Sequence, residues 1–296
     1  MIYANLVQCN KKEQPHCKMW LAITTNYKKG LFLMNSLADL PSELKCHHEL
    51  HKILWGTMRC PDCKHRLLYR KNYEYCPCCH KKTSVRAESA FRNSKLSFRQ
   101  IWAMIWLWQH GASTGEIRRQ LDLSYLTVRR WLKKLRQLLP DDKTAKLYGE
   151  VEVDESFFGK RKFHKQRLVI GAIERHTGRI KLQIITDRTR STCESFIERS
   201  VAPGSLIATD ALGSYNELHL LGYEHEDCNH EVGIFGPTNR IEGLWSVIKR
   251  HIRRVHGNLS FSYEDFHYLL REHQLRHNQP ELFYNVTNYI FTCCSK

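Results

Sequence analysis

Three carboxylates, Asp154, Asp210 and Glu242, stand where they could share metal ions. Asp154 lies in the alternating stretch "GEVEVDESFF", and Asp210 ends the apolar stretch "GSLIATD". Glu242 lies near the start of the amphipathic stretch "TNRIEGLWSVIKRHIRR". Neighbouring carboxylates repel one another and resist burial unless a cation neutralises them. Oxygen ligands of this kind suit Mg²⁺ or Mn²⁺. The pattern predicts a site for two divalent ions, the arrangement that supports phosphoryl transfer.

Basic residues follow the third acid. Lys249 comes seven residues after Glu242, two turns later on the same face of a helix, and Arg250 and Arg253 come next. Positive charge beside an acidic site is expected when the substrate is itself a polyanion. We therefore predict a catalytic role for Lys249 and contacts from Arg250 and Arg253 to a phosphate backbone. The basic stretch "KRKFHK" at residues 160–165 is predicted to be a DNA-contacting hairpin.

Each carboxylate also has a simpler interpretation. Asp210 alone could cap a helix, and Glu242 alone could be a surface acid. Glu150, Glu152 and Glu155, which share the first acidic stretch, are expected to face solvent or to pair with local Lys and Arg. The joint order of the three acids favours the metal site.

The elements that must position these acids begin near residue 147, where the pattern becomes strand-like. One alternating strand, a hairpin of two strands turned at residues 176–178, a helix and a buried strand ending at Asp210 are indicated. Two further helices are expected, one over residues 214–221 and one in the stretch "TNRIEGLWSVIKRHIRR". This order fits a mixed sheet flanked by helices, as in an RNase H-like α/β domain over residues 147–280. The strands of Asp154 and Asp210 would then be neighbours at its centre.

Cysteines define a second site upstream. Cys60 and Cys63 form one CxxC pair, and Cys76 and Cys79 form another after twelve residues. Two such pairs can complete a tetrahedral zinc site, and the short hairpin between them is typical of a zinc ribbon, here over residues 56–92. Four thiolates leave no open coordination position, so this zinc should be structural. Cys78 is surplus, although it could replace a neighbour.

A helix-turn-helix is predicted over residues 93–140. Ser113 with Glu116 fits a capping box, and Ser124 can cap a second helix. The outward face of that helix is basic and could enter the DNA major groove. Its candidate DNA contacts are Thr127, Arg129, Arg130 and Lys133. An ordinary helical hairpin with a solvated charged face is the alternative.

The remaining segments are less informative. Residues 1–55 indicate a poorly defined helical segment, in which His47, His48 and His51 are expected on a solvated helix face rather than at a metal. Residues 281–296 are expected to form a C-terminal tail. The net charge of +16 favours nucleic acid over membrane as a partner. Twelve cysteines without a signal-peptide pattern favour metal binding inside the cell over a disulfide framework.

Taken together, the motifs resemble the DDE transposases of the Merlin superfamily and their bacterial relatives, the ISXO-type insertion sequences. The resemblance rests on "RCPDC" with "YCPCC", "TSVRAESAFRNSKLSFRQIWAMIWLW", "VEVDESFFGKR", "LIATDALGSY" and "TNRIEGLWSVIKR", and it spans about residues 50–260. It implies that Asp154, Asp210 and Glu242 ligate the metals, that Lys249 is the family's basic residue after the third acid, and that the zinc ribbon and helix-turn-helix recognise terminal inverted repeats.

One position departs from the family. Pro237 stands where relatives commonly carry a His, which makes Asn239 a secondary candidate for the third catalytic position and His230 a possible neighbour of the site. The expected function is cutting of double-stranded DNA at element ends and joining of the 3′-hydroxyls to target DNA by a homo-oligomer. The alternatives are a catalytically inactive, domesticated DNA-binding derivative and a nuclease of the same fold. The expected location is the nucleus in a eukaryote, otherwise the cytoplasm or nucleoid.

Overall fold

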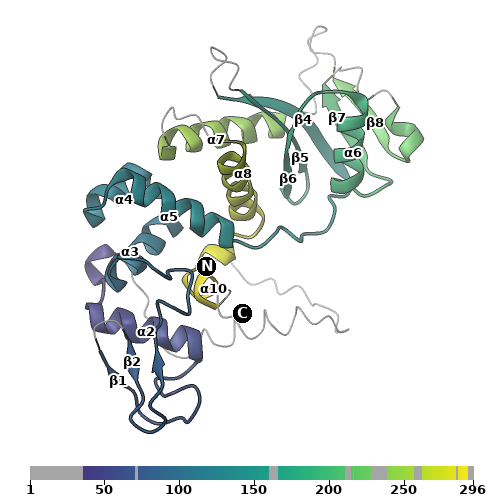
Figure 1. The fold of residues 1–296 in the computed structure, drawn as a ribbon. Helices are drawn as coiled ribbons and strands as arrows, with labels where there is room; N and C mark the ends of the chain where they lie inside the picture. Colours follow the sequence, from purple (N-terminus) through teal and green to yellow (C-terminus); the bar gives the residue numbers. More distant parts are fainter. Residues whose placement is uncertain are drawn as a thin grey trace, which may run out of the picture.

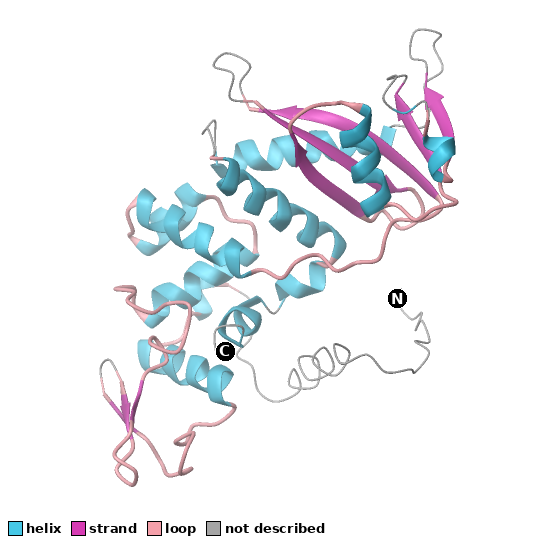
Figure 2. Ribbon diagram, turned by 45° about the vertical axis from the view of Figure 1, so that its right-hand side comes forward, coloured by secondary structure: helices cyan, strands magenta, loops and turns pink. Residues whose placement is uncertain are grey.

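The computed structural model describes residues 36–70, 73–159, 166–210, 215, 217–228, 239–256, 262–284 and 286–292, and Figures 1 and 2 show how they are arranged. The elements of the N-terminal half are η1 (Leu37–Asp39), α2 (Glu43–Trp55), β1 (Leu68–Tyr69), β2 (Glu74–Tyr75), β3 (Lys82–Thr83), α3 (Phe98–Gln109), α4 (Thr114–Leu121) and α5 (Tyr125–Leu138). Those that follow are β4 (Glu150–Phe158), β5 (Arg167–Glu174), β6 (Ile180–Ile185), α6 (Arg190–Ser200), β7 (Leu206–Asp210), η3 (Leu218–Leu221), β8 (Glu224–Cys228), α7 (Asn239–His256), α8 (Tyr263–Asn278), α9 (Pro280–Tyr284) and α10 (Val286–Thr292). Within these ranges no helix is both long and apolar enough to span a bilayer.

The N-terminal helices begin where the sequence places caps. Ser97 and Gln100 form a capping box at α3, and Ser113 and Glu116 form one at α4. Ser124 caps α5 by accepting from the Thr127 amide. Each cap satisfies amides that the first helical turn would otherwise leave without a partner. The predicted pair of short helices is therefore present as α4 and α5.

The C-terminal residues pack differently from the expected tail. Residues 280–284 and 286–292 form α9 and α10, and Phe283, Val286, Ile290 and Phe291 are buried in the same apolar core as α3 and α5. In Figure 1, α10 lies between the N-terminal helices and α8. The chain therefore returns after the sheet domain to complete its first core.

The five-stranded sheet has the order β6-β5-β4-β7-β8. Strands β4, β5 and β6 are antiparallel neighbours, whereas β7 pairs parallel to β4 and β8 pairs parallel to β7. Numbered along the chain, the order is 3-2-1-4-5 with a mixed orientation, which is the RNase H-like arrangement. The predicted adjacency of the strands that carry Asp154 and Asp210 is confirmed. The short helix η3, Leu218–Leu221, takes the place of part of the helix expected over residues 214–221.

Helices cover both faces of this sheet. Cys193, Phe196 and Ile197 of α6 pack with Val151 and Val153 of β4 on one face. On the opposite face, apolar residues of α7 and α8 pack against alternate positions of β5 and β6; they are Ile241, Leu244, Trp245, Ile248, Phe266, Leu269 and Leu270. Figure 2 shows α6 on one side of the strands and the longer helices on the other. The acids on β4 are therefore divided between two faces.

Helix α8 joins the two halves of the molecule. Arg276 donates to the last carbonyls of α3, at Trp108 and Gln109, and Arg271 donates to Leu139 beyond the end of α5. The connecting segment is anchored as well, because Asp142 accepts from Asn278 at 2.9 Å and from Lys181 at 3.3 Å. The predicted boundary near residue 140 is therefore held by polar contacts to the sheet domain.

Candidate active site and zinc ribbon

Asp154 and Asp210 lie at the same level on neighbouring strands. The parallel register pairs Glu152 with Ala208, and two residues further along each strand come Asp154 and Asp210. Because side chains alternate along a strand, both carboxylates point to the face that α7 covers. The paired register ends at Glu152 and Ala208, just before the two acids. Both predicted acids therefore stand at the position where β4 and β7 stop pairing.

Glu152 fixes the start of α7. Its side chain is only 2% exposed, and its Oε2 accepts from the amides of Arg240 at 2.9 Å and Ile241 at 3.0 Å. Its other oxygen accepts from Arg175 at 2.9 Å. A carboxylate at a helix N-terminus satisfies free amides and complements the helix dipole. Of the two expectations for Glu152, exposure to solvent is wrong, whereas the pairing with a local arginine is found at Arg175. The bonds to Arg240 and Ile241, which were not expected, anchor the helix that carries Glu242. Glu150 is exposed and pairs with Arg175, as expected.

Trp245 connects α7 to the first acid. Its indole Nε1 donates to Oδ2 of Asp154 at 2.8 Å, and its ring lies over Gly171, the residue opposite Asp154 on β5. A Cβ at position 171 would lie 2.5 Å from the Trp245 ring. Glycine is therefore needed at this position for the indole to reach the sheet and hold the carboxylate.

The acids influence one another electrostatically. Burial raises the pKa of Asp154, the bonds from the Trp245 indole and the Glu155 amide oppose the rise, and the charges of Asp210 and Glu242 add to it. Burial is the main cause of the raised pKa, and the charges of the two further acids add a smaller part. A divalent cation is the type of ligand that would offset both effects.

Glu242 and Lys249 lie on α7 on either side of Trp245 in the sequence. Glu242 is exposed in the first turn, and Lys249 lies with its Nζ 5.4 Å from the centre of the Phe158 ring, at the end of β4. Seven residues of helix separate them by about 10 Å. Among the described residues, the three acids do not form a group whose ligand atoms all lie within 4.8 Å of one another. Their shared metal site and the role of Lys249 stay predictions.

A second acidic position, Glu155, departs from the expectation that it would face solvent or pair with a local Lys or Arg, because its partner is a buried tyrosine. Glu155, adjacent to Asp154 but on the α6 face, accepts a hydrogen bond from the hydroxyl of Tyr215, and the thiol of Cys193 lies 3.8 Å away. Burial raises the pKa of Glu155, the Tyr215 bond opposes the rise, and Asp154 and Asp210 reinforce it. Tyr215 is fully buried. Tyr215 ends the quoted motif "LIATDALGSY", but nothing in that motif indicated a contact with Glu155.

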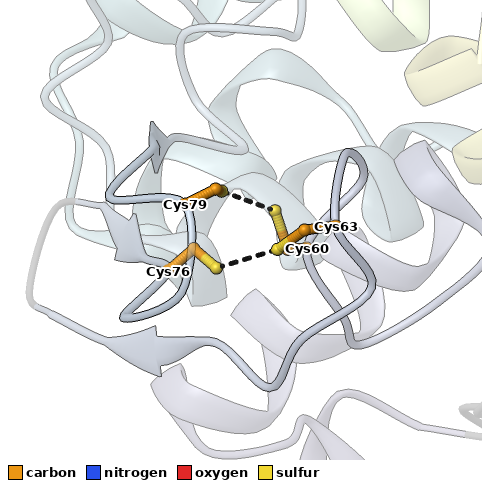
Figure 3. Close-up of side chains that lie close together, drawn as sticks. All are labelled: Cys60, Cys63, Cys76 and Cys79. Carbon is orange, nitrogen blue, oxygen red and sulfur yellow. Dashed lines mark hydrogen bonds between the residues drawn. The ribbon is translucent and has the colours of Figure 1, made fainter.

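The cysteines form the predicted cluster (Figure 3). Sulfur atoms of Cys60, Cys63, Cys76 and Cys79 all lie within 4.8 Å of one another, including Cys63–Cys76 at 3.3 Å and Cys60–Cys79 at 3.6 Å. The two CxxC knuckles share one feature of backbone conformation. Each is followed by a residue with positive φ, Lys64 at 60° and His80 at 58°. Four thiolates in this arrangement suit tetrahedral zinc. Cys78 is exposed and stands outside the group.

The histidine face of α2 is not solvated. His47 and His51 are 4% and 0% exposed. His47 pairs with the fully buried Glu74 of the ribbon, and Nδ1 of His51 lies 2.8 Å from the carbonyl of Thr57. The expectation of a solvated face is therefore wrong, and these residues dock α2 against the ribbon.

The predicted DNA contacts of α5 differ in their surroundings. Arg129 pairs with Asp265 at 3.4 Å, and Lys133 pairs with Glu264 and Asp265 at 2.8 Å each. Arg130 is exposed, and the hydroxyl of Thr127 lies 2.8 Å from that of Ser124. Two of the expected cations thus already have acidic partners within the chain.

The remaining candidates fall into two groups. Arg250 and Arg253 are exposed on α7, and Asn239 is its first residue. His230, Pro237 and the basic stretch at 160–165 lie outside the described residues. DNA contact by any of these positions stays a prediction.

The comparisons with known proteins concern mainly the sheet domain. Residues 146–278 match the family described as the ISXO2-like transposase domain. A curated "Uncharacterized transposase-like protein" of Haemophilus influenzae is 28% identical over 102 residues, which cover 33% of this chain and 80% of that protein. These matches confirm, over the sheet domain, the likeness to ISXO-type transposases that the sequence motifs predicted.

Solved structures give a weaker likeness. The catalytic core domain of BIV integrase has a TM-score of 0.32 and 14% identity, and covers 44% of this chain and 83% of its own. The HTLV-2 integrase catalytic core domain in complex with magnesium has a TM-score of 0.30 and 12% identity. The match covers 43% of this chain and 86% of the integrase domain. The RNase H-like assignment follows from the strand order rather than from these similarities.

Proposed function

We propose that the chain is a DNA transposase that cuts at the ends of its element and joins the freed 3′-hydroxyls to target DNA. The observation that carries the proposal is the level placement of Asp154 and Asp210 where β4 and β7 stop pairing, with the helix of Glu242 anchored beside them by Glu152. Carboxylates at such a position form a donor set for Mg²⁺ or Mn²⁺. Asp154, Asp210 and Glu242 would hold the ions.

Different residues of this chain would orient the acids, neutralise the DNA backbone and bind the terminal repeats. When bound, a pair of divalent ions supplies a more acidic water or hydroxyl nucleophile and stabilises the leaving oxygen. Trp245 keeps the Asp154 carboxylate oriented through its indole N–H. Lys249, Arg250 and Arg253 would neutralise the DNA backbone next to the acids. The zinc ribbon, folded by Cys60, Cys63, Cys76 and Cys79, and helices α4 and α5 would bind the terminal repeats.

Double-stranded DNA is the proposed partner, and two element ends held together imply a homo-oligomer. The nucleus of a eukaryotic host, or the cytoplasm and nucleoid of a bacterial one, is the expected location. Because a nuclease of this fold would cut without joining, strand joining is the discriminating reaction.

The test uses a labelled duplex that carries the ends of the encoding element, a supercoiled target plasmid and Mn²⁺. We expect cleavage and transfer of the labelled 3′-end into the plasmid, and loss of both with Asp154→Asn or Asp210→Asn while DNA binding is retained. Cleavage without transfer would favour the nuclease. Binding without cleavage would favour the inactive, domesticated DNA-binding derivative.

A further inference from the structure

The side of α5 that is predicted to contact DNA lies opposite α8 of the sheet domain. A cavity of about 330 Å³ lies between α5 and α8. Its cationic lining comes from Arg129, Arg130, Lys133 and Arg136, and Asp265 of α8 lies opposite. In a helix-turn-helix the first residues of the second helix are those that meet the base edges. The surface expected to approach DNA therefore faces an acid of the same chain.

Two kinds of ion pair hold α5 against α8. Arg136 and Glu272 are 7% and 5% exposed and form a bond of 2.6 Å, so this pair belongs to the interior. The Lys133–Glu264 pair is accessible, with side chains 34% and 57% exposed. Arg129, at 38%, is accessible as well. Asp265, which pairs with both cations, is less accessible, with its side chain 20% exposed. Solvent-exposed pairs contribute little to stability.

Glu264 and Asp265 lie against the cations of α5 at positions that phosphate groups could also take. Glu264 and Asp265 lie in the first turn of α8, where Ser262 caps the helix by accepting from the Asp265 amide. Lys133 makes contacts of 2.8 Å with both carboxylates, and Arg129 contacts the second. Two adjacent anions thus occupy two adjacent cations of α5. A DNA backbone offers the same pattern of adjacent negative charges.

We propose that the cationic side of this cavity is a binding surface for DNA phosphates and that Glu264 and Asp265 occupy it in the absence of DNA. DNA exchanges places with the two carboxylates at the accessible end of α5, while the buried Arg136–Glu272 pair keeps the domains docked. The inference rests on the proposed function, because DNA is the ligand, but it concerns binding and its regulation rather than cleavage.

The test measures binding of a fluorescein-labelled duplex of arbitrary sequence to the full chain by anisotropy, without added Mg²⁺ or Mn²⁺. Removing both carboxylates with Glu264→Gln and Asp265→Asn should tighten binding about tenfold, because the exposed ion pairs no longer have to be broken. A control with the same change in net charge combines Glu198→Gln and Glu281→Gln at exposed positions on α6 and α9. It should change affinity by less than about twofold, because distant surface charges are screened.

A second pair of substitutions identifies the cations. In the chain that lacks both acids, Arg129→Gln with Lys133→Gln should abolish the tenfold gain. In the wild-type chain the same pair should weaken binding less, because there the cations must first leave their acidic partners. Non-additivity of this kind marks a direct interaction. If loss of Asp265 unfolds α8, Glu264→Gln alone, at a mostly exposed side chain, should still give a gain of about two- to threefold.

The outcomes separate this inference from the proposed function. Equal affinities of the acid-free chain and its charge control would overturn the inference and leave the transposase proposal intact. Absence of DNA binding by every variant would contradict both. Tighter binding without any cleavage activity would support the inference while removing the catalytic proposal.

Discussion

The indole Nε1 of Trp245 donates to Oδ2 of Asp154 at 2.8 Å, across the interface between α7 and β4. The same ring packs on Gly171, so one side chain both fastens the helix of Glu242 to the sheet and orients the first acid. Packing and the acidic site are therefore coupled at this residue.

Trp245→Phe separates the two roles, because phenylalanine keeps most of the packing and removes the donor. A hydrogen bond to a charged group contributes about 1.5–3 kcal/mol. We expect the chain to stay folded, with Mn²⁺ affinity at the acidic site lowered by about tenfold in isothermal titration. Unchanged Mn²⁺ binding would show that the indole does not position Asp154 for metal.

Gly171→Ala should destabilise the sheet domain. The added Cβ would meet two atoms of the Trp245 ring at 2.5 and 2.8 Å, and overpacking of this kind costs about 1–3 kcal/mol. Gly243→Ala on α7 is the matched control, since nothing lies within 4 Å of its Cβ position and alanine favours a helix. Urea denaturation should show a loss for the first variant and none for the second.

Glu152→Gln tests the anchor of α7. Glutamine keeps an acceptor for the amides of Arg240 and Ile241 but loses the charge that Arg175 and the helix dipole require. We expect a loss of about 2–4 kcal/mol in the free energy of unfolding. Glu150→Gln, which removes only the exposed partner of Arg175, should lose less than about 1 kcal/mol. Equal losses would argue against the anchoring role.

Zinc content tests the cysteine assignment. Cys63→Ser and Cys76→Ser should each lower bound zinc, measured by mass spectrometry on purified chain, from one equivalent towards none. Cys78→Ser should retain it, because Cys78 lies outside the group of four sulfur atoms. A chain in which Cys78→Ser loses zinc would require a different ligand set.

Stability should fall in mild acid because of His256. Burial, with the Arg136 guanidinium 3.3 Å from Nε2, lowers its pKa from 6.5 to about 3. The unfolded chain therefore takes up this proton first as the pH falls, so stability is lost progressively between about pH 6.5 and 3.

Between pH 7.5 and 5.5 this linkage amounts to as much as about 1.4 kcal/mol in the free energy of unfolding. His256→Gln should remove it, and His219→Gln, at an exposed site, should not. Identical pH profiles for all three proteins would exclude His256 as the cause.

Much of the architecture could be predicted because it depends on local pattern. Apolar alternation and the turn at residues 176–178 indicated the strands, and the order of elements placed the strands of Asp154 and Asp210 together. Serine caps marked where α4 and α5 begin. The CxxC spacing was sufficient for the cysteine cluster.

The rest depends on contacts between distant segments, which no local pattern encodes. Glu152 reaches the amide of Arg240, 88 residues away, and Lys133 reaches Glu264, 131 residues away. A sequence shows that these residues are charged but not which partner each will meet. The buried histidines of α2 and the return of α10 to the N-terminal core were mispredicted for the same reason.

A crystal structure of the chain soaked in Mn²⁺ tests most directly whether Asp154, Asp210 and Glu242 bind metal. We predict anomalous density between the carboxylates of Asp154 and Asp210, with Glu242 of α7 facing it, and its disappearance in Asp210→Asn. Anomalous density elsewhere, or none at this position in well-ordered crystals, would contradict metal-dependent phosphoryl transfer at this site.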